Sequence, residues 1–136
     1  MNDRVLNEIC SKGNLGGYRE TLKIILEGIL NANCCLSISD ISNRSSIEQL
    51  KNKSSHIRIG LKNKRSNNLS VIWDILHEYG HHLSGFPTYK QPKINREKKA
   101  WNYAEIELKK HTKLIEKFGD FKEYKKCCLK TYKTCT

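Results

Sequence analysis

Two histidines stand four residues apart in the pentapeptide His-Glu-Tyr-Gly-His, which spans residues 77–81. On an α-helix, residues at this spacing lie one turn apart on the same face, so His77 and His81 can point two imidazole nitrogens at one zinc ion. Glu78 would then lie beside that ion, where a carboxylate can act as a general base. The pattern therefore indicates zinc-dependent hydrolysis, with a peptide bond as the favoured substrate. A pentapeptide also occurs by chance on ordinary helices, so its surroundings must support this interpretation.

A catalytic zinc site takes three protein ligands and keeps one position open for water. One class of zinc peptidase continues the pattern as H-E-x-x-H-x-x-G-x-x-H and later adds a methionine turn. Here Ser84 and Pro87 hold the glycine and third-histidine positions, and the single methionine is Met1, which excludes that class. The other common solution takes a glutamate from a second helix. We expect Glu97 to be this third ligand.

Two predicted helices would position these side chains. The segment 70–85 follows residues that can cap a helix and ends at a glycine. Its apolar residues recur at helical spacing on the side opposite both histidines: Ile72, Ile75, Leu76, Tyr79 and Leu83. A second helix is predicted from Asn95 to about Lys117, with Gly119 ending it.

Glu97 falls near the middle of the apolar face of this second helix. An inward carboxylate is costly unless it is paired or bound to a metal, which favours the ligand role. The competing interpretation is that Glu97 only complements the positive end of the helix dipole.

Other polar residues are candidates for supporting roles. Asp74 shares the face of the two histidines one turn earlier and could orient a ligand, although an exposed helical Asp fits equally well. Tyr103, Tyr79 and His111 are candidate donors to the oxyanion of a transition state, and the sequence does not choose among them. His111 lies fourteen residues after Glu97, about 21 Å along a helix, so the two cannot share a metal ion. His82 is expected to be a half-exposed histidine with no role at the metal.

These residues also resemble a known family. The run His-Glu-Tyr-Gly-His-His-Leu at 77–83 and the run Glu-Lys-Lys-Ala-Trp-Asn-Tyr-Ala at 97–104 resemble the ImmA/IrrE group of small, gluzincin-like zinc metallopeptidases. That family has H-E-x-x-H and, after a variable gap, E-x-x-A-x-x-(aromatic)-A. The resemblance covers roughly positions 56 to 108. It implies one Zn²⁺ held by His77, His81 and Glu97, with Glu78 as general base.

The resemblance also implies a cytoplasmic protein that cleaves a DNA-binding repressor and so switches on mobile-element or stress genes. In this family, the strand just before the metal-binding helix offers an edge along which an extended substrate can lie. No segment of the chain matches the helix-turn-helix or sensor domain of the longer members.

The remaining segments predict an α+β fold: a minimal zincin-like domain in which a small, mostly antiparallel sheet precedes the two helices. Helices are expected near 3–10 and 18–31, separated by a glycine-rich turn. Strands are expected at 35–39 and, from alternating apolar residues, at 56–62. Between them we expect a polar connection or short helix to about Lys51, and a basic loop at 62–68 leads into the metal-binding helix.

The length of 136 residues and the 38% hydrophobic composition suit one domain, residues 1–136, with a lysine-rich C-terminal extension at about 119–136. No segment approaches the roughly 20 apolar residues of a membrane span, and the first residues lack the apolar core of a secretory signal. We therefore expect a cytoplasmic protein that does not act at a membrane. Its six cysteines are expected to stay reduced, and their role is open.

The formal net charge is +11, and much of it lies at the C-terminal end. Residues 90–136 contain 14 Lys or Arg against 6 Asp or Glu. This distribution favours acidic partners such as an acidic protein substrate, a DNA-bound repressor or nucleic acid. The second hypothesis is accordingly a basic nucleic-acid- or protein-binding module with a non-catalytic zinc site. No known nucleic-acid motif supports it, so direct nucleic-acid binding is not favoured, and a solvated lysine-rich helix is the preferred interpretation of the tail.

Overall fold

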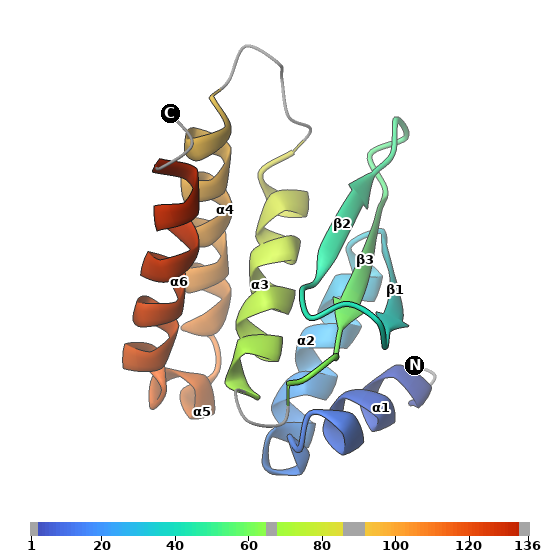
Figure 1. Cartoon of the computed structure of the whole chain (residues 1–136). Coiled ribbons are helices and arrows are strands. Elements are labelled where there is room, and N and C mark those ends of the chain that lie inside the picture. Colours follow the sequence, from blue (N-terminus) through green and yellow to red (C-terminus); the bar gives the residue numbers. More distant parts are fainter. Residues whose placement is uncertain (1–2, 65–67, 86–91, 134–136) are drawn as a thin grey trace.

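The computed structural model describes residues 3–64, 68–85 and 92–133. Within these ranges the chain is α+β, as predicted, with the sheet and two N-terminal helices on one side and three longer helices on the other (Figure 1). The elements in chain order are α1 (Arg4–Lys12), the 3-10 helix η1 (Gly16–Tyr18), α2 (Arg19–Asn31), β1 (Cys34–Ser39), β2 (Ser46–Gln49), β3 (Ser55–Gly60), α3 (Leu69–Leu83), α4 (Lys93–Leu108), α5 (Thr112–Ile115) and α6 (Phe118–Lys133). None of the helices in the described ranges is long and apolar enough to cross a lipid bilayer.

The three strands form a mixed sheet with the order β1-β3-β2. Strand β3 lies in the centre, parallel to β1 and antiparallel to β2. The prediction of a mostly antiparallel sheet is therefore wrong. Only β2 and β3, which follow each other in the chain, form an antiparallel pair. Strand β1 pairs in parallel with the other side of β3. Leu36, Ile47 and Ile57 share one register position across the sheet, which gathers apolar side chains on one face.

Strand β2 replaces the polar connection or short helix that the sequence predicted. Gln49, its last residue, donates hydrogen bonds from Nε2 to the carbonyl oxygens of His81 (3.3 Å) and Gly85 (3.1 Å) at the end of α3. Because β3 is paired on both sides, the strand just before α3 is not the free edge of the sheet. The two outer strands are β1 and β2.

Helix α3 is the central helix of the molecule, between the sheet on one side and α4 and α6 on the other (Figure 1). Its apolar stripe is buried as predicted, except that Leu83 at the helix end is 37% exposed. The opposite face is not solvated, because Trp73, Asp74 and Glu78 are buried as well. The face that carries the two histidines is therefore itself partly covered by neighbouring elements.

The predicted helix from Asn95 to Lys117 is two helices with a change of direction between them. Pro92 precedes the first residue of α4, and the helix ends at Leu108. After the short helix α5, α6 runs back beside α4 (Figure 1). Gly119, the predicted stop, lies in the first turn of α6.

Helix α6 contributes to the core. Phe121 is fully buried and makes edge contacts with Trp73 and Trp101, at 5.4 and 5.6 Å between ring centroids. The indole Nε1 of Trp73 donates a 2.7 Å hydrogen bond to Asp120. Helix α6 is therefore packed against α3 and α4. Residues 134–136, including Cys135, lie outside the described ranges.

Candidate metal centre

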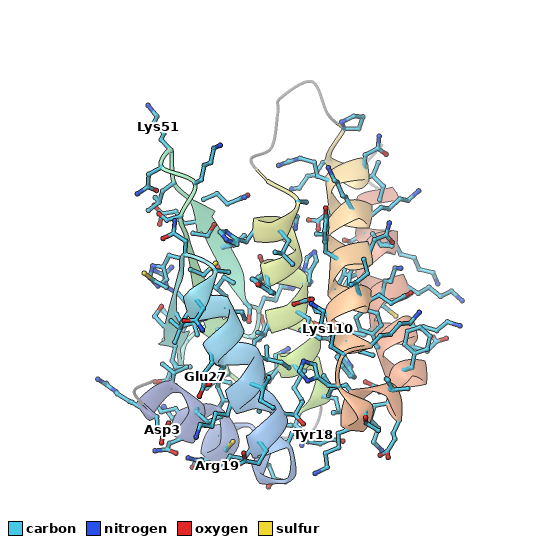
Figure 2. The ribbon with its side chains drawn as sticks, turned by 180° about the vertical axis from the view of Figure 1, so that it is seen from behind. Asp3, Tyr18, Arg19, Glu27, Lys51 and Lys110 are labelled. Atoms are coloured by element: carbon cyan, nitrogen blue, oxygen red, sulfur yellow. The ribbon has the colours of Figure 1, made fainter. Side chains whose placement is uncertain are left out.

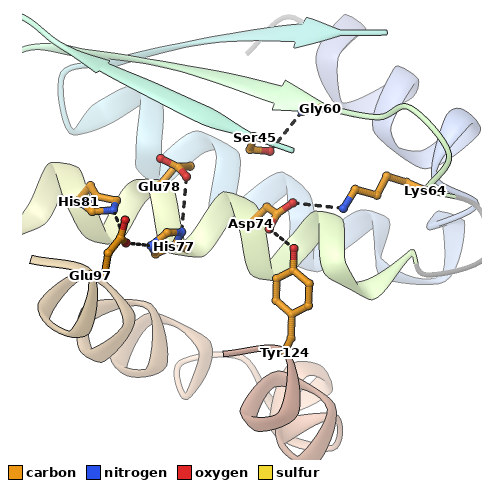
Figure 3. Close-up of polar contacts among 9 residues, drawn as sticks. All are labelled: Ser45, Gly60, Lys64, Asp74, His77, Glu78, His81, Glu97 and Tyr124. Atoms are coloured by element: carbon orange, nitrogen blue, oxygen red, sulfur yellow. Dashed lines mark hydrogen bonds and ion pairs between the residues drawn. The ribbon is translucent and has the colours of Figure 1, made fainter. Parts of the chain in front are cut away.

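His77, His81 and Glu97 meet where the C-terminal half of α3 faces the start of α4 (Figure 3). One carboxylate oxygen, Oε2 of Glu97, lies 2.6 Å from Nε2 of His77 and 2.9 Å from Nε2 of His81. The donor atoms of the three residues all lie within 4.8 Å of one another. The structure therefore brings together the three side chains that the sequence selected as ligands.

The close approach of α3 and α4 depends on a glycine between the two histidines. A Cβ atom placed on Gly80 would lie only 2.1 Å from the carbonyl oxygen of Ala100. The residue after Ala100 is Trp101, whose ring stacks on the His77 imidazole at 4.3 Å and 8°. Gly80 therefore sets the distance between the helices, and Trp101 supports the ring that Glu97 contacts.

The charges at this cluster are strongly coupled. Burial lowers the pKa of His77, but the carboxylates of Glu78 and Glu97 outweigh this effect and raise it to about 9. Burial raises the pKa of Glu97, while hydrogen bonds from His77 and His81 outweigh that effect and hold it well below its usual range. The cluster thus brings an ionised carboxylate next to two imidazoles, and the carboxylate stabilises a positive charge placed between them.

The same donor set fits a metal ion. Two imidazole nitrogens and one carboxylate oxygen are ligands that Zn²⁺ accepts, at about 2.0–2.2 Å each. Tetrahedral ligands at that distance lie about 3.3 Å apart, so small side-chain movements from the observed spacing would suffice. On its other side, Nδ1 of His77 lies 3.4 Å from Oε1 of Glu78. A proton on Nδ1 leaves the Nε2 lone pair directed at the cluster.

A groove of about 750 Å³ runs along this cluster. We call it the metal groove. Its lining includes His77, His81 and Glu97, together with Glu78, the predicted general base, which is only 8% exposed. One wall comes from β2 and the two residues before it, and the other comes from α4 and α6. The free edge of β2 therefore lies along the same groove as the candidate ligands.

Asp74 also lines the metal groove, but its hydrogen bonds do not go to a histidine. Its carboxylate accepts from the Tyr124 hydroxyl at 2.5 Å and from Lys64 Nζ at 3.4 Å (Figure 3). The prediction that Asp74 orients a ligand histidine is therefore not supported by its contacts. It joins α3 to α6 and to the segment before α3.

The predicted oxyanion donors do not lie in the metal groove. Tyr79 is buried on another side of α3, where its ring stacks with His82. Tyr103 is absent from the groove lining, as is His111, which follows α4 at the end away from Glu97. Burial lowers the pKa of His111.

His82 has a defined structural role, which the sequence did not suggest. Its Nε2 donates a 2.7 Å hydrogen bond to the carbonyl oxygen of Ala32, and its Nδ1 pairs with the Ser55 hydroxyl at 2.7 Å. These bonds tie α3 to the end of α2 and to β3. No sequence pattern could have found them, because both partners are distant along the chain.

The groove contains functional candidates that the sequence analysis missed: Arg44, Gln49, Arg96 and Tyr124. Each is a single polar residue with no motif around it. Only Tyr124 carried a signal, since it lies three residues after the buried Phe121 and so on the same side of a helix. Arg44 and Gln49 depend on the position of β2, and Arg96 depends on the packing of α4 against α3.

Comparisons with protein-family models, with curated proteins and with solved structures give no match for this chain.

Proposed function

We propose that this protein is a zinc-dependent peptidase of the ImmA/IrrE type, with a minimal zincin-like fold. The observation that carries the proposal is the cluster of His77, His81 and Glu97 on two packed helices beside a groove. The motif similarity at 77–83 and 97–104 supports the same assignment. A metal held by these residues supplies an activated water and polarises the scissile carbonyl group.

The residues around the cluster have separate tasks in this proposal. Glu78 accepts a proton from the attacking water and passes it to the leaving amine. Its burial keeps the carboxylate away from bulk water. Trp101 and Gly80 hold the ligand helices in register, so that the three ligands keep their positions during turnover.

The free edge of β2 is the proposed support for the substrate backbone. An unpaired edge offers N–H and C=O groups to an extended peptide, which gives affinity without a sequence preference. Gln49 holds the end of this strand against α3, next to His81. A peptide paired with β2 would therefore pass over the proposed metal position.

The test of this function separates metal binding from turnover. A Glu78→Gln variant removes the general base and keeps the side-chain volume, so we expect it to bind one zinc ion per chain and to lose at least about 100-fold in peptide hydrolysis. Zinc is measured by mass spectrometry of the metal, and hydrolysis with denatured protein and with a repressor-like protein as substrates. Full turnover by the zinc-loaded variant would refute the mechanism.

The cellular role is part of the same proposal. A cytoplasmic peptidase of this kind would cleave a regulatory, repressor-like protein. Cleavage of such a protein by the wild type, abolished by a chelator and by Glu78→Gln, is the expected result.

A further inference from the structure

The carboxylates of the metal groove are already engaged by neighbouring side chains. Glu97 contacts His77 and His81, and Glu78 lies beside His77. Asp74 accepts hydrogen bonds from Tyr124 and Lys64. Each of these carboxylates therefore already has a side-chain partner within the protein.

The arginines of the same groove are not engaged in this way. Arg44 lies just before β2, is exposed, and forms no ion pair within the described ranges. Its backbone is held in place, because its N–H donates to the Ser42 hydroxyl at 3.2 Å and its carbonyl oxygen accepts from that hydroxyl at 2.8 Å. The carbonyl also packs directly on Gly60, where a Cβ would come within 2.3 Å of its oxygen. A fixed backbone thus presents a guanidinium group at one end of the groove.

The surroundings of Arg44 place its charge near α6. Burial raises the pKa of Cys128 to about 11 and raises that of Tyr124, and the positive charge of Arg44 opposes both shifts. Tyr124 and Cys128 line the same groove. The guanidinium group of Arg44 therefore lies within electrostatic reach of these two side chains of α6, which line the groove with it.

Arg96 stands on the opposite wall, one residue before Glu97 in α4. Its Nε atom is buried and has no hydrogen-bond partner among the described residues. A buried N–H donor without a partner costs free energy, and a carboxylate is the group that a guanidinium pairs with best. The Arg96 side chain as a whole is partly exposed and lines the groove, so its guanidinium group is available to a carboxylate bound there.

We propose that Arg44 and Arg96 select polypeptide substrates that carry an acidic side chain close to the scissile bond. This inference rests on the proposed peptidase function and specifies its substrate class. Asp74, which marks the Arg44 end, precedes His77 by three residues, about 4.5 Å along the helix axis. A strand advances about 3.3 Å per residue, so the acidic residue belongs within about three residues of the bond that is cut.

The first arm of the test measures binding without turnover. The zinc-loaded Glu78→Gln protein is titrated with fluorescein-labelled decapeptides of Ala and Ser in which one Glu, or one Gln, is moved along the chain. We expect the Glu peptides to bind about tenfold more tightly at one or two positions. This preference should disappear in Arg44→Gln and Arg96→Gln but persist in Arg58→Gln, a matched change at an exposed arginine of β3 outside the groove.

Equal binding of the Glu and Gln peptides, or a preference that survives both groove substitutions, would overturn the inference. A single-stranded decanucleotide that outcompetes every Glu peptide would also overturn it, because the arginines would then serve a phosphate backbone.

The second arm uses the wild-type protein and separates this inference from the peptidase proposal. A proteome-derived peptide library is digested, and the residues around each cut are identified by mass spectrometry. Cuts with Asp or Glu enriched within three residues support the selection of acidic side chains, and cuts without that enrichment overturn it while leaving the peptidase proposal intact. If the zinc-loaded wild type cuts nothing, the peptidase proposal fails, and the binding arm still decides whether the groove prefers acidic peptides.

Discussion

Glu97 is the residue on which the proposed metal binding depends most, because its Oε2 atom contacts both imidazoles of the cluster. We expect Glu97→Ala and His77→Ala to lose stoichiometric zinc, since two remaining ligands do not make a stable site. Zinc per chain is measured after dialysis against metal-free buffer. His111→Ala is the matched control, because this histidine lies beyond the far end of α4, and it should keep one equivalent. Undiminished zinc in Glu97→Ala would show that the ligands are other residues.

A second prediction at the residue scale concerns stability and pH in protein freed of metal by a chelator. The pKa of His77 is raised from 6.5 to about 9, so the folded chain binds this proton more tightly than the unfolded chain. The resulting stabilisation is complete below about pH 6.5 and is lost as the pH rises through 9. Urea unfolding should therefore give a lower free energy of unfolding at pH 9.5 than at pH 6.

The control for this pH effect is Glu97→Gln, which removes one of the two charges that raise the pKa of His77. Its free energy of unfolding should fall less between pH 6 and pH 9.5 than that of the wild type. The lowered pKa of Glu97 itself acts only at acidic pH, below about 4.5, and so does not contribute to this range. Identical pH dependence in the two proteins would contradict the coupling.

At the scale of elements, the contact between α3 and α4 determines the geometry of the site. Gly80→Ala would place a Cβ 2.1 Å from the carbonyl oxygen of Ala100, so the helices must separate. We expect a loss of about 1–3 kcal/mol in the free energy of unfolding and weaker zinc binding, because Glu97 moves away from the imidazoles. Urea unfolding and zinc titration measure the two effects.

Gly28→Ala is the matched control for this prediction. Gly28 also lies inside a helix, α2, but an added Cβ there meets no atom within 4 Å. Because alanine is the better helix former by about 1 kcal/mol, this variant should be as stable as the wild type or slightly more stable. Equal behaviour of the two variants would mean that the α3–α4 contact is not tight.

The elements also explain how far the sequence could predict the fold and the site. The histidine pair and the inward direction of Glu97 follow from the period of the α-helix, which is a local property. Strand β2 was missed because it has four residues and only Ile47 among them is apolar. The turn at 109–111 was missed because it contains two lysines and a histidine, without Gly or Pro. What decides both features is a contact with a distant segment, and such contacts leave little trace in the local sequence.

At the scale of the whole molecule, the same elements carry the positive surface charge and the buried residues of a small core. Lysines project from many parts of the surface, as Lys51 and Lys110 do in Figure 2. The clearest case is α6, where Lys122, Lys126 and Lys130 are exposed while Phe121 is completely buried. The C-terminal segment therefore has two roles, because one face completes the core and the other supplies charge.

These two roles can be separated by mutation. The triple variant Lys122→Gln, Lys126→Gln and Lys130→Gln lowers the net charge from +11 to +8 and changes only exposed side chains. We expect its free energy of unfolding to stay within about 0.5 kcal/mol per substitution of the wild type.

Phe121→Ala removes a ring that packs on Trp73 and Trp101 and should cost about 3–5 kcal/mol, a large part of the stability of a chain this size. Zinc content should follow the same division, unchanged in the triple variant and reduced in Phe121→Ala, because the ring of Trp101 supports His77. If Phe121→Ala unfolded at the same urea concentration as the wild type, α6 would be a solvated extension and not part of the structure that holds the metal site.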